Sequence, residues 1–219
     1  MQEEQEALLM EQRRNEVQEA LKEDLRSLDP KLFYLKHIVK SNNWYFAEYL
    51  KIPTEELIDK MDYFKEIVSS NLNISFHSLQ IVGSAKIGYS LSPQKLFKPF
   101  HDGTQQESSS DIDIAVVSER LYQKYWDKLR NVRGLWNQYY YDQLTKSIFR
   151  GYINDKDLMK INGIREEWTE ITSPINMALQ DNLGFVHPIT YRIYRYWDDL
   201  EDYQLYGISK AKKKLEGAA

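Results

Sequence analysis

Two aspartates one residue apart, Asp111 and Asp113, carry the clearest chemistry in the sequence. They lie in "SSSDIDIAVVS" (residues 108–118), where Asp and Ile alternate before a continuous apolar run, a pattern that predicts a strand. Side chains two residues apart on a strand share a face, so the carboxylates repel unless one is protonated or a cation lies between them. The pair therefore predicts a binding site for Mg²⁺ or Mn²⁺, with Ile112 turned into the core.

A second motif, Gly83-Ser84, ends the apolar run 79–82. Glycine at a strand end lets the backbone approach a ligand closely, and the serine hydroxyl can donate a hydrogen bond to an anion. If a helix begins here, its free N–H groups also face that anion. The motif predicts a phosphate cradle, to which Lys86 would add a positive charge and Ser110 a further nucleotide contact. It is not a P-loop, because the G-x-x-x-x-G-K-[ST] spacing is absent.

Together, "VGSAKIGYSLS" followed by "SDIDIAVVS" resembles the nucleotidyltransferase superfamily of DNA polymerase β, over residues 78–120. The resemblance implies transfer of a nucleoside monophosphate from an NTP or dNTP to a hydroxyl acceptor. It further implies that Gly83 and Ser84 hold the β- and γ-phosphates, and that Asp111 and Asp113 are the catalytic metal ligands.

This sequence departs from the superfamily pattern in two respects. The insert 93–110 is longer than in minimal members and is expected to loop out near the site. The superfamily also takes a third carboxylate from a later strand, and the run 184–195 carries no acid. The candidates beside it are Asp181, Asp198 and Asp199, and the latter two could instead be a charge pair at a helix N-terminus.

The elements predicted around these motifs give an α+β fold, a small mixed sheet flanked and wrapped by helices. Helices are expected over 2–27, from the cap Asp29-Pro30, after Thr54, through most of 119–152, and from 197 onward. A helical region, 1–76, is predicted to pack on a nucleotidyltransferase core, 77–219. The basic run 210–214 is either a solvated helix end or a phosphate contact.

Composition bounds the class of protein. The chain has 219 residues, a net charge of −4 and no cysteine, which excludes disulfides, thiol catalysis and cysteine-ligated zinc. No run of 18 apolar residues occurs, so we expect no membrane span and a cytoplasmic protein.

The size and motifs also resemble stand-alone bacterial nucleotidyltransferases of phage-defence and toxin–antitoxin systems, including the Hailong type. That likeness implies a nucleotide or short oligonucleotide signal and an effector or toxin partner from the same operon. It also suggests Tyr206, rather than Tyr203, as an acceptor hydroxyl in the chain itself, unless both tyrosines simply pack the helix. Two alternatives stay open: a degenerate nucleotidyltransferase that acts as an antitoxin or regulatory partner, and a protein AMP transferase.

Overall fold

The computed structural model describes residues 2–132 and 138–217. Within them the sheet contains β1 (Leu79–Val82), β2 (Ile112–Val117), β3 (Tyr152–Asn154) and β4 (Ile189–Tyr194), in the order β1-β2-β4-β3. β2 and β4 run parallel, whereas β1 is antiparallel to β2 and β3 is antiparallel to β4. The predicted α+β class with a small mixed sheet is thus confirmed.

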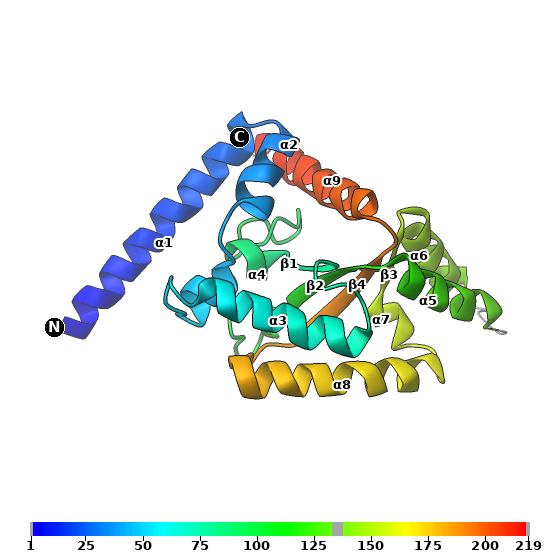
Figure 1. Cartoon of the computed structure of the whole chain (residues 1–219). Coiled ribbons are helices and arrows are strands. Elements are labelled where there is room, and N and C mark those ends of the chain that lie inside the picture. Colours follow the sequence, from blue (N-terminus) through cyan, green and yellow to red (C-terminus); the bar gives the residue numbers. More distant parts are fainter. Residues whose placement is uncertain (1, 133–137, 218–219) are drawn as a thin grey trace.

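Helices cover both faces of this sheet (Figure 1). The alternation of side chains along β2 turns Ile112 and Ile114 toward a large core shared with α3 and α8, and Ala115 and Val117 toward α9. The helical segments are α1 (Gln2–Ser27), α2 (Pro30–Tyr34), the π-helical turns η1 (Leu35–Val39) and η2 (Tyr45–Tyr49), α3 (Leu57–Leu72), α4 (Ser84–Ile87), α5 (Glu119–Asn131), α6 (Gln138–Phe149), α7 (Asp155–Leu158), α8 (Ile164–Leu183) and α9 (Trp197–Glu216).

Local signals located some helices well and others poorly. Asp29 caps α2 as predicted, since its carboxylate accepts a hydrogen bond from the Lys31 amide at 2.8 Å. Thr54 is not the cap of α3, because residues 54–56 form a turn and the helix begins at Leu57. The prediction of helix through most of 119–152 is wrong at its end. Gly151 there takes a φ of 75°, which redirects the chain into β3.

The N-terminal helical region has no core of its own. Side chains of η2 and α3 belong to the same buried cluster as β1, β2 and β4. Leu21 and Leu25 of α1 are buried with residues of α2 and α9, whereas Leu8, in the N-terminal half of α1, is 68% exposed. The N-terminal part of α1 projects from the body (Figure 1). No helix in the described part of the chain is long and apolar enough to cross a membrane.

Candidate functional site

Strand register brings the two sequence motifs into contact. Because β1 is antiparallel to β2, Val82 lies opposite Asp113, and Gly83 follows directly beside the Asp113 carboxylate. Gly83 has φ 68° and ψ −151°, a region that side chains other than glycine essentially avoid. A Cβ atom at Gly83 would lie 2.6 Å from Asp113 Oδ2. Both the backbone conformation and the close approach therefore require glycine at this position.

Asp113 is held by its neighbour on β4. Thr190 lies opposite Asp113 in the parallel pair, and its hydroxyl donates a hydrogen bond to Asp113 Oδ1 at 3.0 Å. Burial raises the pKa of the Asp113 carboxyl, the charge of Asp111 acts in the same direction, and the Arg192 guanidinium opposes both. A cation bound at the pair would therefore stabilise the ionised form of Asp113.

Asp111 lies one residue before β2 and is open to solvent, with 40% of its side chain exposed. Its Oδ2 is 3.1 Å from the Lys156 ammonium. Between the two acids Ile112 is fully buried, as the sequence predicted. The two acids thus keep their carboxylates at the N-terminal end of β2, while the residue between them packs into the core.

The carboxylate oxygens at the N-terminal end of β2 suit a hard divalent cation as ligands. Carboxylate and hydroxyl oxygens are what Mg²⁺ and Mn²⁺ prefer, and Mg²⁺ usually keeps several water or phosphate oxygens in its shell. Across residues 2–132 and 138–217, no group of three or more His, Cys, Asp or Glu side chains is placed to hold a metal ion together. Asp111 and Asp113 would therefore supply two ligands, and water or substrate oxygens the rest.

The structure does not bring the proposed third carboxylates to this pair. Since β2 and β4 are parallel, Asp198 and Asp199 follow β4 at the end of the sheet opposite Asp113. Asp199 instead caps α9, where its Oδ2 accepts from the Tyr196 amide at 3.0 Å. Asp181 is exposed on α8, and this helix packs against the other face of the sheet. Strand direction thus places Asp198 and Asp199 away from the pair, and the position of α8 places Asp181 away from it.

Lys86 also differs from its predicted role. Its side chain is buried, and its ammonium donates to the carbonyl oxygens of Ser41 at 2.6 Å and Asn42 at 3.3 Å. Burial lowers the pKa of Lys86 to about 8. Two residues along a helix are about 200° apart around its axis, so Ser84 and Lys86 on α4 point to different sides. Lys86 therefore adds no charge beside Ser84.

Two hollows meet at Ser84, which lines both of them together with Ser90 and Ser92. The insert hollow has a volume of about 310 Å³ and is further lined by Lys95, Lys98, Pro99, His101, Glu107, Ser108, Ser109, Ser110 and Asp111. The α9 hollow has a volume of about 330 Å³ and is further lined by Ile38, Val82, Gly83, Leu91, Pro93, Arg150, Arg192, Tyr203, Gln204, Tyr206, Gly207, Ile208 and Lys210.

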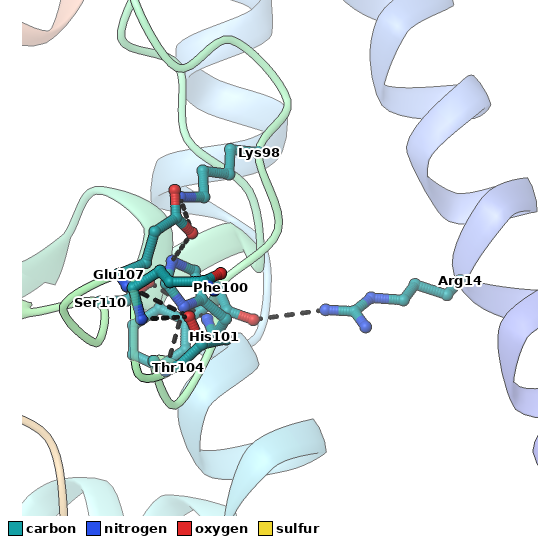
Figure 2. Close-up of polar contacts among 9 residues, drawn as sticks. Arg14, Lys98, Phe100, His101, Thr104, Glu107 and Ser110 are labelled. Atoms are coloured by element: carbon teal, nitrogen blue, oxygen red, sulfur yellow. Dashed lines mark hydrogen bonds and ion pairs between the residues drawn. The ribbon is translucent and has the colours of Figure 1, made fainter.

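Polar contacts fold the insert into the wall of its hollow (Figure 2). The Lys98 ammonium binds the Glu107 carboxylate at 2.6 Å, and the His101 amide donates to the Ser110 hydroxyl oxygen at 3.1 Å. Arg14 on α1 donates to the Phe100 carbonyl at 3.3 Å, which ties the insert to the N-terminal helix. The structure thus places the insert beside the candidate site, with Ser110 next to Asp111 on the wall.

Tyrosines and cations line the α9 hollow. Tyr206 is 45% exposed, and its ring lies 4.7 Å from the Arg150 guanidinium and 4.4 Å from the Lys210 ammonium. The neighbouring Lys210 lowers the pKa of the Tyr206 phenol. Tyr203 is half-buried, with Arg192 stacked 4.6 Å from its ring. Of the two tyrosines, Tyr206 is thus the accessible one.

Sequence reasoning missed several residues that contact these motifs. Thr190 and Arg192 alternate on β4, and their position beside Asp113 follows only from the pairing of β2 with β4. Lys156 and Arg150 lie just after and just before β3, a strand that was not predicted. A strand signal was present in Tyr152–Asn154, whose aromatic and β-branched residues follow a glycine. The helical pattern of the residues that precede β3 obscured this strand signal.

Comparisons with known proteins add no relative. No family model matches the chain, and no curated protein or solved structure is significantly similar to it. The chemical interpretation of this site therefore depends on its own residues and geometry.

Proposed function

We propose that this protein is a metal-dependent nucleotidyltransferase that transfers a nucleoside monophosphate from an NTP or dNTP to a hydroxyl. The contact between Gly83 and Asp113 carries the proposal. It joins a strand-end Gly-Ser turn to an Asp-x-Asp strand: Gly83 lies against the Asp113 carboxylate, and Ser84 and Asp111 line the same hollow. A phosphate-binding turn beside a paired-carboxylate metal site suits phosphoryl-type chemistry.

The reaction is a substitution at the α-phosphorus. The acceptor oxygen forms a bond to phosphorus, the bond to the bridging oxygen of pyrophosphate breaks, and the acceptor proton passes to solvent. Ser84 would donate to a phosphate oxygen, while Thr190 holds Asp113 in place through their hydrogen bond. Bound Mg²⁺ or Mn²⁺ would neutralise charge on the phosphate oxygens. In the biological setting that the motifs suggest, the product is a nucleotide or oligonucleotide signal.

The test is incubation of the full chain with each α-labelled NTP and dNTP and with Mg²⁺ or Mn²⁺. Products are then separated into free, nucleic-acid-linked and protein-linked label. Asp111→Asn and Asp113→Asn should each remove nearly all transfer, while Asp59→Asn, an exposed acid on α3, should leave it unchanged. Wild-type turnover in either site variant contradicts the metal-ligand assignment. Label found on other proteins would instead identify a protein AMP transferase.

A second candidate function follows from the charges around the pair. Lys156 contacts Asp111, and Arg192 opposes the rise that burial causes in the pKa of Asp113, so the protein itself supplies positive charge where the superfamily has a third acid. This arrangement favours a degenerate nucleotidyltransferase that binds a toxin or effector partner. The same experiment separates the two functions, because a degenerate protein forms no labelled product with any nucleotide.

A further inference from the structure

Three cations converge on the α9 hollow from separate parts of the fold. Arg150 precedes β3, Arg192 lies on β4, and Lys210 lies on α9. In the part of the chain that the structure describes, none of the three has a carboxylate oxygen within the 4.0 Å of an ion pair, although Asp113 and Arg192 interact electrostatically. Arg192 Nε is moreover buried without a hydrogen-bond partner. The hollow therefore combines three cations with one buried donor, Arg192 Nε, that has no hydrogen-bond partner.

This concentration of charge has a physical consequence. Like charges held together destabilise the folded state, and a bound anion removes that repulsion. The insert hollow differs, since Lys98 there is paired with Glu107 and Asp111 with Lys156. Arg150 and Lys210 both flank the Tyr206 ring, which explains their positions but leaves their charge uncompensated. Of the two hollows, the α9 hollow is therefore the one whose lining favours binding of an anion.

We propose that the α9 hollow binds the phosphate groups of the acceptor, so that the acceptor is itself a nucleotide or another phosphorylated alcohol. This inference rests on the proposed function, which requires two substrates. A donor bound through a metal needs Asp111, which lines the insert hollow and not the α9 hollow, whereas Gly83 lines the α9 hollow and Ser84 lines both. The α9 hollow meets that space at Ser84 and, at about 330 Å³, falls within the range of roughly 300–1,000 Å³ for ligand pockets. The acceptor would therefore bind metal-free, through protein cations alone.

Calorimetric titration of the full chain distinguishes this anion site from the donor site. In EDTA, inorganic tripolyphosphate should bind wild type, and Arg150→Gln and Lys210→Gln should each weaken that binding about tenfold, as expected for one charge-assisted hydrogen bond. Lys214→Gln removes an equal charge from the exposed end of the same helix and should change little. Thermal unfolding without ligand should show that both hollow variants are as stable as wild type or more so.

The donor is probed with α,β-methylene ATP and Mg²⁺. Its binding should fall in Asp113→Asn and persist in Lys210→Gln. Three results overturn the proposal: no metal-free binding of tripolyphosphate, an equal loss in Lys214→Gln, or loss of the ATP analogue in Lys210→Gln, which would place the donor's own phosphates in this hollow. Nucleotide transfer without metal-free anion binding refutes the acceptor site in the α9 hollow and leaves the proposed function standing. Anion binding without any transfer refutes the proposed function alone.

Discussion

Replacing Gly83 by alanine tests the contact on which the site depends. At φ 68° and ψ −151°, a residue other than glycine costs about 1–3 kcal/mol in backbone strain. The new Cβ atom would also lie 2.6 Å from Asp113 Oδ2, and relief of such overpacking costs typically about 1–3 kcal/mol more. Gly83→Ala should therefore lower the free energy of unfolding by about 2–6 kcal/mol, the sum of those two ranges.

A second glycine on the same chain, in the left-handed helical region, provides a comparison without crowding. Gly184 also has a positive φ, of 70°, but a Cβ atom there meets nothing within 4 Å. Gly184→Ala should cost only the backbone part, about 1–2 kcal/mol for a left-handed residue. Urea unfolding gives both values, provided that the slope m is unchanged between variants.

A double-mutant cycle with Asp113→Ala then measures the contact itself. With the carboxylate removed, Gly83→Ala should lose the crowding part of its cost, so the coupling energy should be about 1 kcal/mol or more. A coupling near zero, together with equal costs at Gly83 and Gly184, would refute the close approach of the two motifs. Nucleotide binding should fall in Gly83→Ala as well, because relief of the clash must move the Asp113 carboxylate.

Three further outcomes follow from single side chains. Ser84→Ala removes one donor to a charged phosphate, about 1.5–3 kcal/mol, so nucleotide affinity or turnover should drop about tenfold or more, and an unchanged titration would assign Gly83-Ser84 a purely structural role. Burial raises the pKa of Asp155 from 3.8 to about 6, so the stability associated with its neutral form is present below pH 4 and is lost as pH rises through 6. Asp155→Asn should then stabilise the protein at pH 8 by up to about 3 kcal/mol and much less at pH 4, and an equal gain at both pH values in urea unfolding would contradict this. If Tyr206 is an acceptor, intact mass after incubation with nucleotide and Mg²⁺ should rise by whole nucleotide units and stay constant in Tyr206→Phe, whereas free product without any adduct excludes it.

The sequence determined the local features of the site. Alternation in "DIDI" is a property of neighbouring residues, and it correctly buried Ile112 while keeping Asp111 accessible. Glycine at position 83 marked a backbone that no other residue adopts easily. Asp29 before a proline was sufficient to locate a helix start. Each of these signals acts within a few residues, so each can be recognised without knowledge of the fold.

Only the tertiary structure decided which distant residues meet. The antiparallel register of β1 on β2 set the contact between Gly83 and Asp113, and the parallel pairing of β2 with β4 gave Asp113 a threonine neighbour and moved Asp199 to the far end of the sheet. The side on which Lys86 lies depends on the carbonyl groups of Ser41 and Asn42, which come from an earlier part of the chain. Register and strand direction are fixed by packing of the whole core rather than by local pattern, which is why the sequence could locate the acids but could not predict their partners.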